Sequence, residues 1–479
     1  MPSGYPRWRP GTGTALRASD HARTRVERVT GIEPDPAAAR TARARFTEAR
    51  AAGRRRIRCK CSFPLRRSLL GMRESERMDR RNSRIGRRSV LVAAGAWVAL
   101  TATAQPTQAV MITQEASPGP DRPAQRADQA EQAIVQRYVR TFWGEPQLQL
   151  GTLYWPASLL EQMLLGRWCY WWQAHLLDCA VDAAHRARTP ERIDRVLALA
   201  RAIRVRNLTG WTNGYYDDMS WLILALERAQ RLLGIRFGEA IADLRTALYA
   251  GWQPNVGAVP WRSHDDYYST SAIGPTGIAM ARSGELARAA ALSEFLQTRL
   301  RDTDSGLIRD GVHEPDGRAD RATPTYCQGV AIGLETELAT RTGDSIHRRR
   351  ASDLIAATAA RLTDAGVIAA ASANDSGLFM GILARYLAEA ALALGDTTAA
   401  NIVHASARAA WEHRAEVGDL PLFGMDWTRP VTVPDHPGTF AQLTHSSTGR
   451  AANLSRDLSV QLSGWMLLEA DHRLTAAGH

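Results

Sequence analysis

The sequence predicts an all-α protein, an (α/α)6 barrel built from six helical hairpins. Apolar residues recur at spacings of three and four from about residue 128 almost to the end of the 479-residue chain, and no segment shows the alternation that is typical of a strand. An open solenoid of hairpins would repeat a motif every 34 to 47 residues or so. No such motif is present and the connections differ greatly in length, so we expect a closed ring with inner helices that are apolar nearly all round.

Each expected helix rests on this apolar spacing, with Ala, Leu, Arg and Glu at most other positions. The segment "SWLILALERAQRLLG" is an example, because Trp221, Leu224, Ala225 and Leu232 share one face and Gly234 is a typical C-terminal stop. The expected helices cover residues 128–142, 156–185, 190–206, 217–234, 237–249, 270–282, 285–301, 325–341, 346–364, 376–394, 397–413 and 456–476. The longer connections, 251–268, 302–324 and 414–455, should gather over one mouth of the ring, where function concentrates.

The basic character of the chain belongs to its N-terminal part. Residues 1–104 contain 24 Lys and Arg against 8 Asp and Glu, whereas the remainder contains 36 basic and 41 acidic residues. Because the chain after residue 104, which we call the body, has a small net negative charge, it does not attract phosphate groups. We therefore expect no nucleic-acid partner.

The N-terminal part also carries an export signal. Within 78–104, "RRNSRIGRRSVLVAAGAWVALTATA" has an arginine-rich start, a short apolar run and a small-residue cleavage site, and it is similar to a twin-arginine signal peptide. The run is short for a membrane-spanning helix, although an uncleaved anchor stays an alternative. We expect a secreted or cell-envelope protein without stable membrane insertion.

The other boundaries follow from composition. Residues 1–77 are rich in Arg, Ala and Pro without apolar periodicity, which indicates a disordered extension or a start codon assigned too far upstream. Residues 105–127 read as a Pro- and Gln-rich linker, and 128–479 as a single catalytic domain.

The cysteines and histidines predict no metal site and no cofactor. Cys169 and Cys179 are ten residues apart in a helical pattern, about 15 Å, which is too far for a mutual disulfide, and Cys327 is left over. The twelve histidines show no metal-ligand spacing, and His175 in "WWQAHLLD" reads as a core residue.

The segment "NGYYDDMSW", 213–221, holds the strongest catalytic candidates, Asp217 and Asp218. Two neighbouring carboxyls at a loop-to-helix junction can lie at about the 5–5.5 Å separation that a retaining glycosidase needs between nucleophile and acid/base. The pair is equally compatible with a helix N-terminus, where Asp residues stabilise free N–H groups. A second pair, Asp265 and Asp266 in "HDDYYS", shows that adjacent aspartates alone are weak evidence.

Tryptophans favour the carbohydrate interpretation, because an indole face stacks on a sugar ring and several of these residues stand in the expected loops. They are Trp211, Trp252, Trp261 and Trp427. The sequence has no G-x-S-x-G elbow and no P-loop that would indicate other chemistry.

Seven blocks in order resemble glycoside hydrolase family 76, the endo-α-1,6-mannanases. They span about residues 130–472 and read "YWWQAHLLDCAVDA", "YYDDMSW", "DTDSGLIRDGV", "TYCQGVAIGLETEL", "SGLFMGILARYLAEAA", "PLFGMDW" and "LSVQLSGWMLLEA". The resemblance implies an (α/α)6 barrel and a retaining hydrolase of α-1,6-linked mannan. It implies that Asp217 is the nucleophile and Asp218 the general acid/base, an order that the residues alone leave open.

The resemblance also implies a substrate-binding set. Thr325, Tyr326 and Gln328 match the family's T-Y-N-Q-G block, but Cys327 stands in place of Asn, which puts the fine substrate preference in doubt. The other expected sugar contacts are Asn213, Tyr215, Tyr216, Trp221 and Trp261. The expected partner is an α-mannan polysaccharide or oligosaccharide, from a fungal wall or a bacterial envelope.

Two alternatives stay open at this point. One is another (α/α)6 enzyme that acts on acidic polysaccharide, for which the loops offer Arg262, Arg309, Arg318 and Arg321. The other is a glycan-binding protein without catalysis.

Overall fold

The computed structural model describes residues 122–370, 376–433 and 456–479. The expected N-terminal extension 1–77, the signal peptide 78–104 and most of the linker 105–127 lie outside these residues. The last six residues of that linker, 122–127, form the first turns of a helix.

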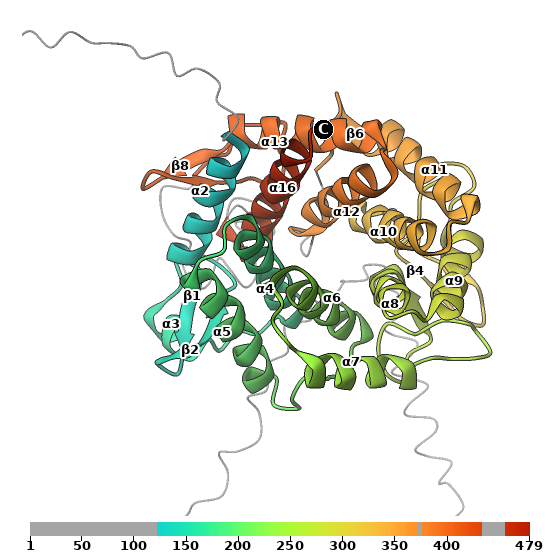
Figure 1. The fold of residues 1–479 in the computed structure, drawn as a ribbon, viewed down its shortest axis with the longest axis horizontal. Helices are drawn as coiled ribbons and strands as arrows, with labels where there is room; N and C mark the ends of the chain where they lie inside the picture. Colours follow the sequence, from blue (N-terminus) through green and yellow to red (C-terminus); the bar gives the residue numbers. More distant parts are fainter. Residues whose placement is uncertain (1–121, 371–375, 434–455) are drawn as a thin grey trace, which may run out of the picture. The chain divides into compact units, whose positions relative to one another are not determined.

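Two concentric rings of helices form the described part of the chain (Figure 1). The inner ring is α4 (Tyr170–Arg186), α6 (Tyr216–Leu233), α8 (Thr270–Arg282), α10 (Thr325–Thr342), α12 (Phe379–Leu394) and α16 (Leu458–Ala476). The outer ring is α2 (Arg122–Arg137), α5 (Pro190–Arg206), α7 (Gly238–Ala250), α9 (Leu286–Phe295), α11 (Ser345–Arg361) and α13 (Thr397–Glu412). Each inner helix packs on the next, and α16 packs on α4, so the ring closes and the predicted (α/α)6 barrel is confirmed.

Inner and outer helices differ in how much of their surface is apolar, as the sequence predicted. Every residue of α4 from Tyr170 to Ala184 is buried, whereas the outer helix α5 buries only one face. Glycines let some inner helices approach closely. A Cβ on Gly329 of α10 would lie 2.9 Å from the Cα of Leu383, and one on Gly381 of α12 would lie 2.7 Å from the Cα of Ser463.

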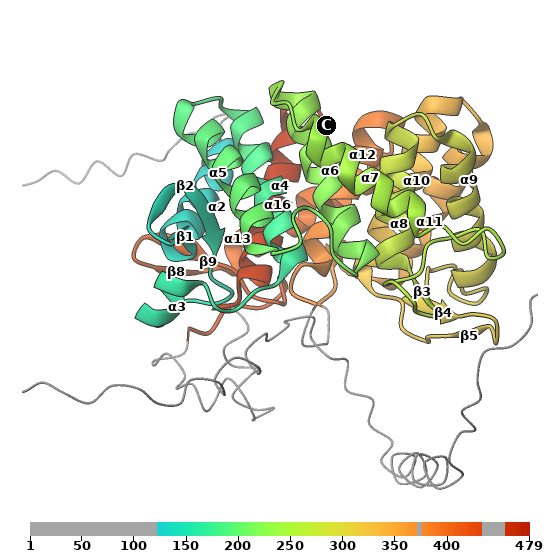
Figure 2. The same cartoon turned by 90° about the horizontal axis from the view of Figure 1, so that it is seen from below.

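The two ends of the barrel have different connections. All six inner helices begin at one end, which we call the mouth, and each is reached from an outer helix by a long connection. At the opposite end, the floor, short links such as 187–189, 343–344 and 395–396 lead back to the outer ring. Figure 2 shows the strands β3, β4 and β5 at the mouth.

The expectation that the chain has no strands is wrong. The mouth connections hold the hairpin β1 (Val139–Phe142) and β2 (Glu145–Gly151), the three-stranded sheet of β3 (Tyr267–Ser269), β4 (Gly311–His313) and β5 (Arg318–Ala319), and the pairs β6 (Thr363–Asp364) with β7 (Val367–Ile368) and β8 (Ala415–Val417) with β9 (Leu420–Leu422). Most of these strands have two or three residues, which is too short for an alternating pattern to appear in the sequence.

Four expected helices also differ from the structure. The first begins at Arg122 and ends at Arg137, so 139–142 is strand and not helix. The expected helix 346–364 ends at Arg361, and its last two residues form β6. The expected helix 156–185 is divided into α3 (Leu159–Leu164) and α4, because Leu165 has left-handed backbone and ends α3. The expected helix 285–301 is α9 followed by one π-helical turn, η1 (Leu296–Leu300).

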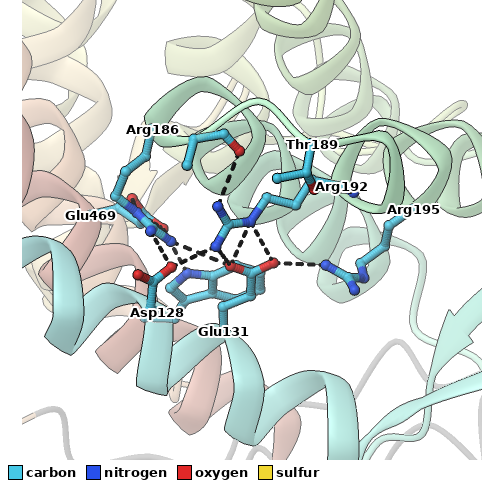
Figure 3. A network of polar contacts seen from close by, with 9 residues as sticks. Asp128, Glu131, Arg186, Thr189, Arg192, Arg195 and Glu469 are labelled. Atoms are coloured by element: carbon cyan, nitrogen blue, oxygen red, sulfur yellow. Dashed lines mark hydrogen bonds and ion pairs between the residues drawn. The ribbon is translucent and has the colours of Figure 1, made fainter.

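A network of charged side chains joins the first and last helices of the ring (Figure 3). Arg186 of α4 contacts Glu469 of α16 at 3.0 Å and Glu131 of α2 at 3.3 Å. Arg192 and Arg195 of α5 reach Glu131 at 2.6 and 2.7 Å. Because these charges are mostly buried, each depends on its partners, and the network fixes α2 and α16 against α4.

Two further properties concern the described residues. Their free cysteines, Cys169, Cys179 and Cys327, are all buried. None of their helices combines the length and the apolar character that crossing a membrane requires.

Candidate active site

Asp217 and Asp218 lie in the first turn of α6 at the mouth, and both are buried. The N-cap is Tyr215, whose side chain makes no capping bond, so neither aspartate is the cap itself. Their position still places two carboxylates at the positive end of the helix dipole, which stabilises negative charge.

Donors from three different parts of the chain converge on the carboxylate of Asp217. Trp261, in the loop before β3, donates its indole N–H to Oδ2 at 3.0 Å, and the hydroxyl of Ser271 in α8 donates to the same oxygen at 3.2 Å. The backbone N–H of Asp218 donates to Oδ1 at 2.9 Å. Hydrogen bonds to a carboxylate stabilise its ionised form, so the site holds Asp217 as an oriented anion.

Asp218 has a different environment. Asn213 donates its side-chain N–H to Oδ2 at 3.0 Å, and its own Oδ1 accepts the backbone N–H of Tyr215 at 2.8 Å, which fixes the amide. Burial raises the pKa of the Tyr170 phenol in α4 well above its ordinary value, and the nearby charge of Asp218 raises it further. The hydroxyl of Tyr170 donates to the carbonyl oxygen of Trp211 at 2.6 Å.

Aromatic rings extend the site from Asp217 toward β3. Trp261 packs edge to face on Tyr215 at 5.3 Å between ring centroids and on Tyr267 at 6.3 Å. The hydroxyl of Tyr267 contacts Asp320 Oδ2 at 2.7 Å and Asp310 Oδ2 at 3.0 Å. Burial, Asp310 and Asp320 raise the pKa of Tyr267 well above its ordinary value, so the phenol keeps its proton and its role as a donor.

The residues of the T-Y-C-Q-G block at the start of α10 lie in different settings. Tyr326 donates its hydroxyl to Asp310 and so joins the cluster around Tyr267. Thr325 is buried as the first residue of the helix. Gln328 is fully buried, and its amide exchanges two hydrogen bonds of 2.8 Å with the backbone of Ile308. The side chain that we expected to bind sugar therefore anchors the loop that carries Asp310.

Cys327 also faces Asp310, with its Sγ 3.9 Å from Oδ1. Burial and the neighbouring Asp310 raise the pKa of this thiol, which keeps it neutral. A neutral thiol is a weak donor, so the position contributes less polarity than an amide would.

Two other residues that we expected to contact sugar, Tyr216 and Trp221, pack on other parts of the protein. Tyr216 covers Gly251 with its ring, and a Cβ on that glycine would come within 2.3 Å of the phenol carbons. Trp221 is buried against His175 at 4.7 Å between ring centroids. His175 is a core residue, as the sequence predicted, and burial lowers its pKa to about 3, so it is neutral.

Two of the tryptophans that we expected to stack on sugar, and the second aspartate pair, contact other parts of the protein. Trp427 and Trp211 are buried in the core. Asp265 accepts from Arg262 at 2.6 Å, and Asp266 lies 3.0 Å from His313. This pair therefore helps to fold the loop of the three-stranded sheet.

The sequence reasoning missed Ser271, Tyr267, Asp310 and Tyr170. Asp310 stands inside the quoted block "DTDSGLIRDGV", so a signal existed for it. Ser271 and Tyr267 carry no local signal, because only the packing of α8 and β3 against α6 brings them to the site. Within the described ranges, no three His, Cys, Asp or Glu side chains gather in a way that could hold a metal ion.

Comparisons with known proteins agree with the fold. An α-1,6-mannanase of Salegentibacter sp. HEL1_6 is similar in structure, with 24% identity, a TM-score of 0.61 and coverage of 73% of this chain and 98% of that one. An inactive variant of the same enzyme, with two consecutive aspartates changed to Asn and α-1,6-mannotriose bound, has 23% identity, a TM-score of 0.61 and coverage of 73% and 99%. The Lin0763 protein of Listeria innocua has 24% identity, a TM-score of 0.63 and coverage of 74% and 99%.

The search of curated proteins found no match to the chain. The family model described as glycosyl hydrolase family 76 matches residues 124–457, which is more than half of the sequence. The chain therefore belongs to glycosyl hydrolase family 76.

Proposed function

We propose that this protein is a secreted endo-α-1,6-mannanase that cleaves its substrate with retention of configuration. The observation that carries the proposal is the pair of buried, adjacent carboxylates at the mouth, Asp217 and Asp218, each oriented by its own set of donors. The inactive variant of the Salegentibacter enzyme, in which two consecutive aspartates are replaced and α-1,6-mannotriose is bound, supports the same assignment.

The different environments of the two carboxylates support different roles. Asp217 receives an indole N–H, a hydroxyl and a backbone N–H, which suits an ionised nucleophile. Asp218 shares its surroundings with a neutral amide and a buried phenol, which suits a group that gains and loses a proton.

The reaction proceeds in two steps on these groups. Asp217 attacks the anomeric carbon, the glycosidic C–O bond breaks, and Asp218 gives its proton to the departing oxygen. A water molecule then gives a proton to Asp218 and attacks the same carbon, which breaks the bond to Asp217 and releases the sugar. Two inversions give net retention.

The polar groups around Trp261 favour a neutral substrate over an acidic one. Three of the four arginines that could have bound a uronate carboxylate have carboxylate partners of their own: Arg262 with Asp265, Arg309 with Asp302 and Arg318 with Asp316. Asp310 and Asp320 add negative charge close to the site, which would repel an acidic sugar.

The test is digestion of an unbranched α-1,6-mannan by the purified protein. We expect a rapid fall in polymer length with release of oligosaccharides, and proton NMR should show the α-anomer as the first product. A β-anomer would contradict the retaining mechanism. Turnover of uronate polymers but not of mannan would favour the acidic-polysaccharide alternative, and mannan binding without turnover by a folded protein would favour a glycan-binding protein.

Export is tested separately. Mass spectrometry of the protein recovered outside the cytoplasm should find an N-terminus close after Ala104. Intact residues 78–104 on the recovered protein would support an uncleaved anchor instead.

A further inference from the structure

The large apolar side chains that are exposed on the described part of the protein lie in three short segments. Three belong to α3 and one to the β1–β2 hairpin tip, and the other two lie at the end of α5. Their exposed fractions are 62% for Trp143, 79% for Leu159, 67% for Leu160, 67% for Met163, 37% for Val205 and 83% for Leu208. We call these six residues the apolar corner. A monomeric protein rarely exposes such side chains together, and a patch of this kind commonly marks a binding surface.

Hydrogen bonds hold the segments of the apolar corner together. Arg140 of β1 donates to the side chain of Gln162 in α3 at 3.1 Å. Arg206, the last residue of α5, donates to the carbonyl oxygens of Leu165 and Gly166 at 3.4 and 3.1 Å. The corner lies outside the ring of outer helices and on the side of the mouth (Figures 1 and 2).

An exposed tryptophan stands at the hairpin tip, in a turn whose backbone conformation favours other residues. Phe142 pairs with Glu145, so Trp143 and Gly144 form a two-residue turn, and both have positive φ, 55° and 75°. Such turns favour Asn-Gly, and a bulky residue with left-handed backbone is uncommon. Its indole stacks on Phe142 at 4.2 Å between ring centroids and is still 62% exposed, so much of the ring is available to a partner outside the protein.

The charges beside the apolar corner are mainly positive. Arg140 and Arg206 donate to carbonyl and amide oxygens, and Arg167 follows α3 directly. Arg201 and Arg204 are exposed in the last two turns of α5. Glu145 and Glu161 are the acidic residues of the hairpin tip and of α3. This excess of arginine contrasts with the mildly acidic body as a whole.

We propose that the apolar corner is a docking surface for an anionic lipid membrane. Leucine, methionine and tryptophan side chains would enter the headgroup boundary while the arginines contact lipid phosphates, the combination by which interfacial segments bind. Leucine and methionine offer no flat face for a sugar ring, which makes a bound mannan chain a weaker explanation. Docking would place the mouth of the barrel at the membrane surface.

The test is co-sedimentation of the full chain with vesicles of equal parts phosphatidylcholine and phosphatidylglycerol. The decisive variant is Leu159→Ser combined with Leu160→Ser and Met163→Ser, and we expect vesicle binding at least about tenfold weaker than for the wild type. Because the basic residues 1–104 would themselves bind anionic vesicles, the comparison is decided with both proteins beginning after residue 104. Equal binding of the two proteins would overturn the proposal.

A second variant separates docking from folding. Trp143→Asn places a residue that suits positive φ in the turn, so we expect an unchanged or higher melting temperature together with weaker vesicle binding. The double variant Arg201→Gln with Arg204→Gln removes two exposed arginines beside the apolar corner, and we expect it to weaken vesicle binding. Its matched control, Arg348→Gln with Arg349→Gln, removes two exposed arginines of α11 and should leave vesicle binding unchanged.

Other occupants give different results, each of which would overturn the proposal. A second copy would appear as a dimer in sedimentation velocity that the triple serine variant abolishes, without vesicle binding. If the occupant were a mannan chain, mannan in the gel would retard the protein in affinity electrophoresis, and Trp143→Asn would abolish this retardation. Vesicle binding would then be absent, or the same in the wild type and the variant.

Discussion

At the mouth, the start of α6 presents Asp217 and Asp218 to donors from neighbouring segments, whereas about midway along the inner helices a central charge cluster joins the helices to one another. Arg228 of α6 pairs with Asp178 and Asp182 of α4, and Arg385 of α12 reaches the same two aspartates at 3.3 and 2.7 Å. All four side chains are buried.

The two carboxylate pairs differ in what balances their charge. In the central charge cluster, guanidinium groups neutralise the aspartates, and although burial opposes it, Arg228 and Arg385 lower the pKa of Asp182 well below its usual range. At the mouth, neutral N–H and O–H groups donate hydrogen bonds to Asp217 and Asp218. A carboxylate that is held by neutral donors can still react, whereas one that is locked in an ion pair mainly stabilises the fold. The difference predicts that substitutions at the mouth can abolish activity without unfolding the protein, whereas substitutions in the central charge cluster destabilise the fold.

The largest effect should come from Asp217→Asn and Asp218→Asn, each made alone. We expect kcat on α-1,6-mannan to fall by about 10³-fold or more, because each change removes a group that bonds to the reacting atoms, with a change in melting temperature of only a few degrees. Reducing-end assays and calorimetry measure the two quantities.

The other adjacent pair supplies the matched control for these variants. Asp265→Asn combined with Asp266→Asn should change kcat by no more than a few-fold, since that pair contacts Arg262 and His313 in a loop. Loss of activity in this control and not in the Asp217 and Asp218 variants would contradict the assignment.

The second effect concerns the central charge cluster. Arg228→Met leaves Asp178 and Asp182 with one guanidinium instead of two, and breaking a buried pair in this way costs about 3–5 kcal/mol of unfolding free energy. Urea denaturation should show this loss, while kcat per folded molecule stays within a few-fold of the wild type.

An exposed arginine gives the comparison for Arg228. Arg204 contacts Glu239 at 3.7 Å and its side chain is 54% exposed, so Arg204→Met should change stability by less than about 0.5 kcal/mol. If Arg228→Met were as mild as Arg204→Met, the central charge cluster would not be a main source of stability.

A smaller effect on catalysis should come from Trp261→Phe. The ring keeps its packing on Tyr215 and Tyr267 but loses the N–H that donates to Asp217, so we expect kcat to fall by about tenfold to a hundredfold at nearly unchanged melting temperature. Trp252→Phe, a change in the same connection, is the control. A drop in KM alone would contradict a role in orienting the nucleophile.

The smallest effect is on the pH dependence of stability. Burial, partly offset by Arg282 and Arg245, raises the pKa of Glu227 on α6 from 4.5 to about 7. The folded protein therefore binds this proton more tightly than the unfolded chain does, so stability is complete below about pH 4.5 and is lost as the pH rises through 7.

The measurement is urea denaturation of the wild type and of Glu227→Gln between pH 5 and 8. The wild type should lose about 1–2 kcal/mol more than the variant across this range. The same slope in both proteins would show that Glu227 is not the group that titrates.

The sequence by itself determined the helical class, the six hairpins and the adjacent aspartates that are the catalytic candidates. Apolar spacing survives in any context because burial of one helix face dictates it, so helices such as α6 and α10 are found within a residue or two of their bounds. The pair in "YYDDMSW" is local in sequence, and the order of blocks identified the family before any geometry was known.

Only the tertiary structure decided which side chains reach the pair. Trp261 and Ser271 lie 44 and 54 residues from Asp217 and meet it because the loop before β3 and the start of α8 pack against α6. Gln328 is turned to the backbone of Ile308, and Trp427 is buried, although both looked like sugar contacts in the sequence. Side-chain direction at a loop-to-helix junction depends on neighbours that are distant in sequence, and no local pattern encodes them.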